Sequence, residues 1–156
     1  MSVALAAISS VAPAAADGSR AGTASGSARV VDLTTLKAGQ PVMHKRGDGV
    51  KPPAELGNPS EWGVVKIEIP KAGVSVRPLG GSCQQVSHGQ WCYGWEFSGS
   101  KKQCYSNYMA NVQHMSSVRV VNIDYASGWV RAGLTSNARS DTIGQAYTCY
   151  SYYNNA

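Results

Sequence analysis

Hydrophobic and polar residues alternate over a short stretch of the chain that begins at Val64. In the segment VVKIEI, every second residue from Val65 to Ile69 is aliphatic, and the residues between them are charged. This period of two is typical of a strand with one buried and one exposed face. Residues 70–73 predict a turn, and the segment VSVRPL after it resembles a second strand. We therefore expect a β-hairpin over residues 64–79 that leads into the main domain.

Five further stretches predict the strands of a folded domain over residues 80–156. In chain order they are QWCYGWEF, CYSNYMANVQH, SVRVVNID, GWVRAG and GQAYTCYSYYN. Tyr, Trp and Val, which favour strands, are frequent in them, and Gly, Ser and Asn separate them. The stretch GLTSNARSDTIGQA is ambiguous and is compatible with a single helical turn. The pattern predicts an all-β domain, a small antiparallel β-sandwich or barrel.

The first of these strands carries an aromatic row on one face, formed by Trp91, Tyr93, Trp95 and Phe97. A row at this spacing is typical of a sandwich core, and a slip of one residue would turn every ring to solvent. The last strand differs, because tyrosines occupy both of its faces and at least one pair should be exposed. We expect Tyr150 and Tyr152 to form part of a partner-binding surface, with ordinary packing in the sheet as the alternative.

The N-terminal stretch SVALAAISSVAPAAADGS has the pattern of an export signal. A short apolar run precedes three alanines at positions 14–16, which suits cleavage before Asp17. The run is far shorter than the roughly 20 apolar residues of a bilayer span, and no other stretch approaches that length. We expect residues 1–16 to be the signal peptide of a secreted protein without stable membrane insertion.

Residues 17–63 predict an arm rather than a domain. Small, polar, Pro and Gly residues dominate this region, and prolines at positions 52, 53 and 59 exclude a long helix. We expect a flexible or extended arm with isolated β pieces. Such a basic segment can enter the cleft of a partner protein in extended form. The candidate docking residues are Arg20, Arg29, Lys45 and Arg46, and an inert linker is the alternative.

The cysteine count predicts a disulfide framework, because a secreted chain with an even number of cysteines usually pairs them. The four cysteines allow three connectivities. We expect Cys83–Cys92 to close a loop and Cys104–Cys149 to tie an inner strand to the last one. A zinc site is the alternative, but no C-x-x-C pair is present. We therefore expect neither a metal nor another cofactor.

The charged and nucleophilic residues favour binding over catalysis. The net charge of +5 is spread along the chain, whereas nucleic-acid-binding proteins cluster Lys and Arg beside aromatic residues. We expect no nucleic-acid partner. Ser116 or Ser117 with His114 and Asp124 resembles a catalytic triad, but no nucleophile motif accompanies it. We expect a structural hydrogen bond at His114 and no catalytic residue.

Five blocks, WCYGWEF, YSNY, HMSSVRV, SGWVRAG and QAYTCYSYYN, resemble in this order the lactococcin 972 family of bacteriocins. The resemblance covers about residues 80–156. It implies a small secreted β-sandwich of antiparallel sheets and a free-standing bacteriocin that binds the cell-wall precursor lipid II, as the family prototype does. The chain departs from that prototype in its set of cysteines and in the long segment between the signal and the sandwich.

The layout of an extension followed by a sandwich is similar to the small adaptor subunit of actinobacterial umbrella toxin particles. This resemblance implies a non-enzymatic adaptor that joins a repeat-bearing toxin subunit to a lectin-bearing subunit with a trypsin-like domain. The sandwich would bind one subunit, and the arm would dock in the cleft of the trypsin-like domain. The adaptor is our leading prediction. A bacteriocin that binds lipid II and a secreted inhibitor of a trypsin-like protease are the alternatives.

Overall fold

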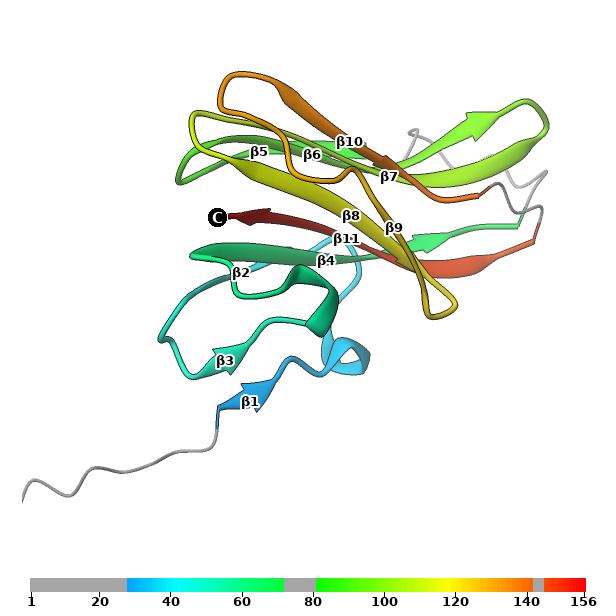
Figure 1. Ribbon diagram of the computed structural model, residues 1–156. Helices are drawn as coiled ribbons and strands as arrows, with labels where there is room; N and C mark the ends of the chain where they lie inside the picture. Colours follow the sequence, from blue (N-terminus) through cyan, green and yellow to red (C-terminus); the bar gives the residue numbers. More distant parts are fainter. Residues whose placement is uncertain (1–27, 72–80, 142–144) are drawn as a thin grey trace, which may run out of the picture.

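The computed structural model describes residues 28–71, 81–141 and 145–156, and it confirms the predicted all-β sandwich. Two antiparallel sheets face each other (Figure 1). The four-stranded sheet has the order β10-β7-β6-β5, with β5 at Gly81–Val86, β6 at Gly89–Ser98, β7 at Lys101–Ala110 and β10 at Thr135–Arg139. The five-stranded sheet has the order β2-β4-β11-β8-β9, with β2 at Val42–Lys45, β4 at Glu61–Ile69, β8 at His114–Val120, β9 at Ile123–Ala126 and β11 at Tyr147–Asn155.

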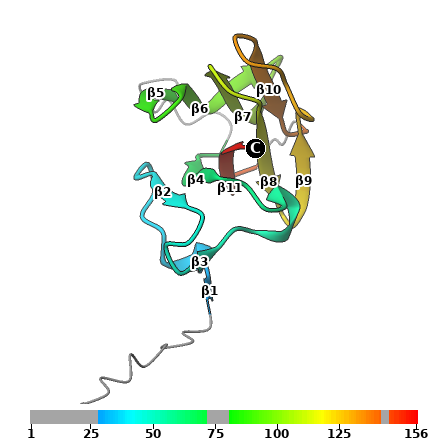
Figure 2. The ribbon, with the colours of Figure 1, turned by 60° about the vertical axis from the view of Figure 1, so that its left-hand side comes forward.

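Residues 28–41 and 46–60, which we call the N-terminal layer, cover the outer face of the five-stranded sheet (Figures 1 and 2). The layer contains the parallel pair β1 (Arg29–Val30) and β3 (Val50–Lys51) and the 3-10 turns η1 (Leu33–Thr35) and η2 (Ala54–Leu56). The expectation of a flexible arm over residues 17–63 is therefore wrong from residue 28 onward, whereas the isolated β pieces expected in this region are present as β1, β2 and β3. Residues 17–27 lie outside the described residues.

A small apolar core fixes the N-terminal layer to the sheet. Trp62 and Tyr152 project from the outer face of the sheet, and Leu56 of the layer packs in the same cluster. All three side chains are at most 2% exposed. Burial of one large apolar side chain contributes about 1.5–3 kcal/mol. This burial outweighs the Pro and Gly content that predicted an arm.

Strand β4 confirms the predicted strand, but the strand lies inside the sheet and its first half is buried on both faces. It begins at Glu61, before the expected start at Val64, and pairs with β2 on one edge and with β11 on the other. The boundary predicted between arm and hairpin thus falls within a single strand. The expected second strand of the hairpin, at residues 74–79, lies outside the described residues.

Strand β10 forms where the sequence predicted an ambiguous segment. It pairs with β7, and its side chains alternate, with Ser136 and Ala138 buried in the sandwich. The residues of β10 are small or polar, so they show no clear alternation of apolar side chains. The strand forms because it pairs with the edge of β7, and not because of its own strand propensity. The strand expected at GWVRAG is reduced to one bridge between Val130 and His114.

The main core lies between the two sheets and contains most of the predicted aromatic row. Trp91, Tyr93 and Trp95 are buried in it. The ring of Trp91 lies 4.9 Å from the ring of Tyr153 on the opposite sheet. Phe97 is 55% exposed, so the prediction is wrong for this residue. It lies near the end of β6, beyond the buried Trp95.

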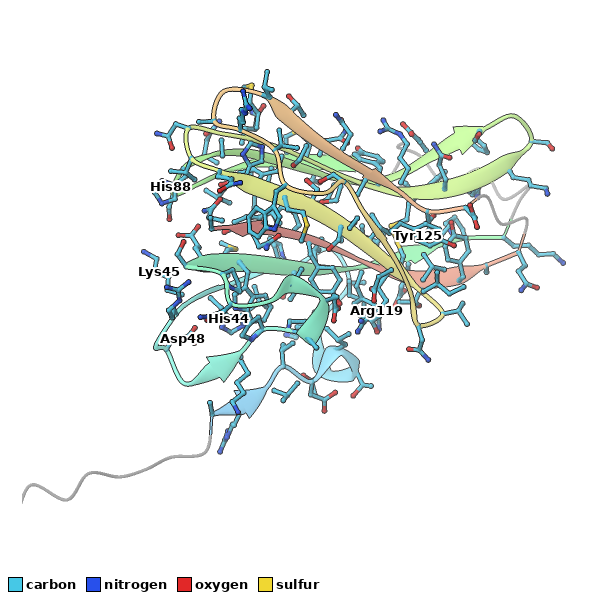
Figure 3. All side chains as sticks on the ribbon, in the orientation of Figure 1. His44, Lys45, Asp48, His88, Arg119 and Tyr125 are labelled. Carbon is cyan, nitrogen blue, oxygen red and sulfur yellow. A yellow bond between two sulfur atoms is a disulfide. The ribbon has the colours of Figure 1, made fainter. Side chains whose placement is uncertain are left out.

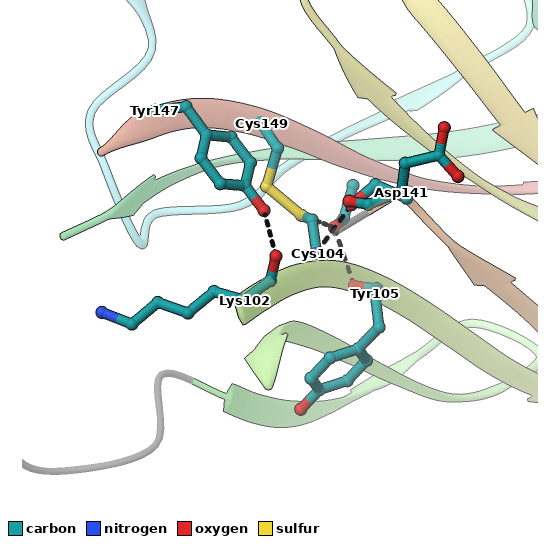
Figure 4. Close-up of a disulfide and its surroundings, with 8 residues drawn as sticks. Lys102, Cys104, Tyr105, Asp141, Tyr147 and Cys149 are labelled. Carbon is teal, nitrogen blue, oxygen red and sulfur yellow. Dashed lines mark hydrogen bonds between the residues drawn. A yellow bond between two sulfur atoms is a disulfide. The ribbon is translucent and has the colours of Figure 1, made fainter. Parts of the chain in front are cut away.

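Both predicted disulfides are present. Cys83–Cys92 joins directly opposed residues of β5 and β6. Cys104–Cys149 joins β7 to β11, an inner strand of one sheet to an inner strand of the other (Figure 4). The second bond therefore fixes the two sheets against each other.

We predict that loss of the bond Cys104–Cys149 costs more stability than loss of Cys83–Cys92. The two bonds have sequence separations of 45 and 9 residues. Restriction of the unfolded chain then predicts losses of about 4 and about 3 kcal/mol, respectively. Urea denaturation of the two double alanine variants measures both values. A larger loss for the Cys83–Cys92 pair would contradict the assigned role of the bond between sheets.

We predict that Trp62→Ala lowers the free energy of unfolding by about 3–5 kcal/mol, because it empties the core under the N-terminal layer. Trp129→Ala is the matched control, since Trp129 is 50% exposed. Its expected effect is within about 0.5 kcal/mol of zero. Denaturation of both variants, followed by far-ultraviolet circular dichroism, measures the difference. Equal effects would mean that the layer does not pack on the sheet.

Two neighbouring tyrosines of β11 offer a second matched pair. The hydroxyl of Tyr152 is buried and has no hydrogen-bond partner among the described residues, whereas Tyr153 Oη donates to Glu61 Oε1 at 2.9 Å. Burial raises the pKa of both phenols, so each is neutral at ordinary pH. We predict that Tyr152→Phe leaves the free energy of unfolding unchanged or raises it.

The companion variant Tyr153→Phe should lower the free energy of unfolding by about 1–3 kcal/mol, because the Glu61 carboxylate would lose its buried donor. Glu61 is only 5% exposed, so water cannot readily replace the phenol. Thermal denaturation at neutral pH compares the two variants. Destabilisation by Tyr152→Phe to the same extent would contradict the different surroundings of the two hydroxyls.

Candidate functional site

The surface predicted around Tyr150 and Tyr152 is covered by the N-terminal layer. Both side chains lie on the outer face of β11 and pack in the cluster beneath the layer. Tyr152 is 0% exposed and Tyr150 is half-buried. The prediction of an exposed partner surface is therefore wrong for Tyr152, and Tyr150 presents only part of its ring. Alternation in a sequence separates the two faces of a strand but does not show what covers them.

A charged cluster also ties the N-terminal layer to the sheet. Arg119 of β8 pairs with Glu55 of η2 at 2.6 Å and with Asp124 of β9 at 2.8 Å (Figure 3). Hydrogen bonds to Asp124 raise the pKa of Arg119, with the charge of Glu55 acting in the same direction. The backbone N–H of Ser60 donates to Asn155 O at 3.1 Å. The layer is thus a fixed part of the domain.

The structure brings three of the four predicted arm residues to one end of the N-terminal layer. Lys45 ends β2, and Arg46 follows it in the turn to β3 (Figure 3). The backbone N–H of Arg29 donates to Gly49 O at 2.9 Å, which places β1 beside the same turn. All three of these basic residues are exposed. Arg20, the fourth, lies outside the described residues.

Arg46 is fixed within the layer and is not part of an extended chain. Its Nη2 and Nε atoms donate to the carbonyl oxygens of Asn58 and Pro59, at 2.5 and 3.2 Å. These bonds connect the turn after β2 to the loop before β4. Arg46 therefore does not lie in an extended chain, because its guanidinium is engaged in the fold, and its binding of a partner stays a prediction.

The acid of this turn is also engaged in the fold. The Asp48 carboxylate accepts hydrogen bonds from the backbone N–H groups of Val50 and Lys45, at 2.9 and 3.3 Å, and lies 2.8 Å from His44 Nδ1 (Figure 3). The N–H of Val50, with a smaller contribution from His44, lowers the pKa of Asp48. The ring of His44 stacks on Trp62 with 4.4 Å between centroids. The turn is thereby joined to the core beneath the layer.

A pocket of about 270 Å³ opens beside this turn. The side chains that give it its chemistry are Arg46, Lys51, Val50, Pro52, Pro59 and Trp62. None of the described residues that line it is Asp or Glu. We call it the basic pocket. Sequence reasoning missed Lys51, although its position between an apolar residue and two prolines is a usable signal for an exposed cation.

The residues that resembled a catalytic triad make structural contacts instead. His114 is buried, with Nδ1 2.8 Å from Val112 O and Nε2 2.9 Å from Tyr108 O. The hydroxyl of Ser116 shares a hydrogen bond with that of Ser136. Both imidazole nitrogens face carbonyl oxygens, so this histidine is not placed to accept a proton from a serine.

Two other kinds of site are absent from the part of the chain that the structure describes. Residues 28–71, 81–141 and 145–156 contain no group of three His, Cys, Asp or Glu residues placed to hold a metal ion. Their helical segments include none with the length and apolar character needed to cross a bilayer.

The outer face of the four-stranded sheet is a second surface, on the side of the molecule opposite the N-terminal layer (Figure 1). Gly94 lies between Gly81 and Tyr105 in the strand register. The Tyr105 side chain extends across Gly94 as far as Gly81, since a Cβ built on Gly81 would lie 2.1 Å from the Tyr105 hydroxyl. Arg139 Nε donates to Glu96 Oε1 at 2.8 Å on the same face. The result is a polar surface that carries one ion pair.

A second pocket, of about 360 Å³, lies at one end of this polar surface. Its lining includes the amides of Gln85 and Gln90, the imidazole of His88 and the exposed side chain of Met109. Lysine, arginine and acidic residues are absent from the described residues that line it. The two pockets therefore differ in charge, and one is lined by the N-terminal layer and the other by the four-stranded sheet.

Comparison with known proteins gives one match. Residues 87–153 match the family described as Bacteriocin (Lactococcin_972), a segment that runs from the turn before β6 almost to the end of β11. No curated protein and no solved structure matches the chain. The N-terminal layer and β4 precede the matched segment. Over residues 87–153 the protein is thus similar to the lactococcin 972 bacteriocins, as the sequence blocks predicted.

Proposed function

We propose that this protein is a secreted, non-enzymatic adaptor subunit of an antibacterial toxin complex. The observation that supports this proposal most is the fixed N-terminal layer, which adds a surface to a bacteriocin-like sandwich from outside the family match. The layer and the outer face of the four-stranded sheet lie on opposite sides of the molecule (Figure 1). Two partners can therefore bind one copy of the chain without competing for a surface.

The chemistry of the two surfaces supports the selection of different partners. The basic pocket carries Arg46 and Lys51, whereas the opposite face offers amides, Tyr105 and the ion pair between Arg139 and Glu96. Charge differences of this kind discriminate among partners, because a mismatched charge at an interface is costly. Both surfaces are built on one rigid pair of sheets, so the relative position of the two partners would be set by this chain.

The proposed partners are a trypsin-like, lectin-bearing subunit and a repeat-bearing toxin subunit, as the layout of the chain implies. In this proposal residues 17–27, including Arg20, dock in the cleft of the trypsin-like subunit through main-chain hydrogen bonds and one side chain. Residues from Arg29 onward are engaged in the fold, so the docking segment ends where β1 begins. Two disulfides in one small domain and the bacteriocin match support secretion.

The family match favours a second candidate, a free-standing bacteriocin that binds a cell-wall precursor such as lipid II. In this case the N-terminal layer would serve only to stabilise the sheet, and no partner subunit would be needed. The two functions differ in whether the protein works in a large complex or alone.

Recovery of the native complex tests the proposed function. The full chain, tagged at its exposed C-terminal residue Ala156, is purified from the culture supernatant of its producer and analysed by size and mass spectrometry. We expect a large complex that contains a repeat protein and a trypsin-like lectin. A free monomer would overturn the adaptor function and favour the bacteriocin, and a lipid II binding assay would then be the next measurement.

A matched deletion tests the docking segment separately. Removal of residues 18–27 leaves the predicted cleavage site and the described fold in place. We expect this variant to keep its melting temperature, to lose the trypsin-like subunit and to retain the repeat-bearing one. Loss of both subunits, or of neither, would contradict docking through this segment.

A further inference from the structure

The basic pocket contains unpaired positive charge. Among the described residues Arg119 and Arg139 each lie within 2.8 Å of a carboxylate oxygen, whereas other exposed cations such as Lys101 form no ion pair. The basic pocket differs from those isolated positions because it brings two such cations together. Arg46 and Lys51 form no ion pair with any acid of the described residues. The guanidinium of Arg46 uses two of its nitrogen atoms for carbonyl oxygens, which satisfies donors but does not neutralise the charge. The pocket therefore favours an anionic group from outside the described chain.

The acid of the adjoining turn, Asp48, cannot supply that group. The oxygen atoms of Asp48 accept backbone hydrogen bonds from Lys45 and Val50 and contact His44, so they are directed into the turn. The neighbouring Gly47 and Gly49 have positive φ values of 92° and 87°, a conformation that favours glycine. A Cβ built on either glycine would meet nothing within 4 Å, so the space over the turn is open to a ligand.

The floor and walls of the basic pocket are apolar. Trp62 is 1% exposed overall and is stacked on His44, which fixes its ring, and Pro52, Pro59 and Val50 line the same pocket. An anionic group on a short apolar stem can therefore bury the stem against these rings while its charge reaches the two cations. A volume of about 270 Å³ lies just below the range of about 300–1,000 Å³ that is typical of small-molecule sites, and it suits one or two side chains of a protein.

We infer that the basic pocket binds an acidic side chain, flanked by apolar residues, from a polypeptide segment of a partner protein. The carboxylate lies between Arg46 and Lys51, and the flanking apolar side chain covers the edge of Trp62. This inference rests on the proposed function in one respect, because it takes the occupant to be a partner subunit. It adds a chemical criterion for that subunit: an exposed segment with Glu or Asp beside Leu, Val or an aromatic residue.

The test uses the full chain labelled with ¹⁵N and two synthetic peptides, one with a glutamate between two leucines and one with glutamine in its place. We expect the glutamate peptide to shift the Trp62 indole and the Gly47 and Gly49 amide signals. Binding should weaken as ionic strength rises to about 0.3 M, where screening is strong. Equal binding of the glutamine peptide, or no shift with about 1 mM glutamate peptide, would overturn the inference.

Charge reversal supplies the matched variants. Lys51→Glu places an acid in the pocket, and Lys37→Glu makes the same change at an exposed position of the N-terminal layer outside it. We expect Lys51→Glu to weaken peptide binding at least about tenfold and Lys37→Glu less than about twofold, because only the first touches the carboxylate. Equal losses for the two variants would show general attraction to a basic surface and would overturn the assignment.

A titration with inorganic phosphate tests whether the pocket is specific for a polypeptide or binds any anion. If the pocket needs the apolar stem, phosphate binds much more weakly than the glutamate peptide. Phosphate binding as tight as that of the peptide would overturn the inference of a polypeptide ligand.

The native complex distinguishes a failure of this inference from a failure of the proposed function. A Lys51→Glu chain that still recovers both subunits would overturn the pocket assignment and leave the adaptor function standing. A wild-type chain recovered as a monomer that nevertheless binds the glutamate peptide at the pocket would overturn the adaptor function. In that case the chemical assignment of the pocket is supported independently.

Discussion

The contact between β7 and β11 holds the rest of the structure in place. These strands lie inside the two sheets, and the bond Cys104–Cys149 joins them covalently. Ser106 Oγ, which accepts from Trp91 Nε1 at 2.9 Å, donates to Tyr152 O at 2.7 Å in the opposite sheet. A side chain as short as serine can bridge to a backbone carbonyl only if the two strands lie close together. The disulfide and the hydroxyl therefore set the spacing of the sandwich.

Strand β11 carries this constraint through to the outside of the molecule. Its inner residues, Cys149, Ser151 and Tyr153, contact the other sheet, and its outer residues Tyr150 and Tyr152 receive the N-terminal layer. The position of the layer, and of the basic pocket on it, therefore depends on the same strand that sets the spacing of the sheets. A rigid relation between two outer surfaces is what a chain that joins two partners requires.

Polar residues inside the sandwich favour one arrangement of the facing strands. The chain contains one Phe, and buried serines accompany Trp and Tyr in its core. The hydroxyl groups of Ser116 and Ser136 share a hydrogen bond. The carbonyl oxygen of Tyr108 accepts from Ser136 Oγ and lies within hydrogen-bond distance of His114 Nε2. Buried polar groups must find partners, so each such bond favours one register of the facing strands. These contacts explain why residues that resemble a catalytic set in the sequence are structural here.

The sequence by itself determined the strands with clear alternation and the aromatic row from Trp91 to Trp95, and it led to the correct prediction of the bond Cys83–Cys92 among three possible connectivities. These features depend on the period of two within a strand and on residues close together in the chain. Only the tertiary structure decided that small polar residues at 135–139 form a strand, that Tyr152 is buried and that Arg46 and Lys51 share a pocket. A pattern along the chain shows which residues lie on the same face of a strand. What covers that face depends on contacts between distant segments, such as Leu56 with Tyr152, for which neither segment carries a local signal.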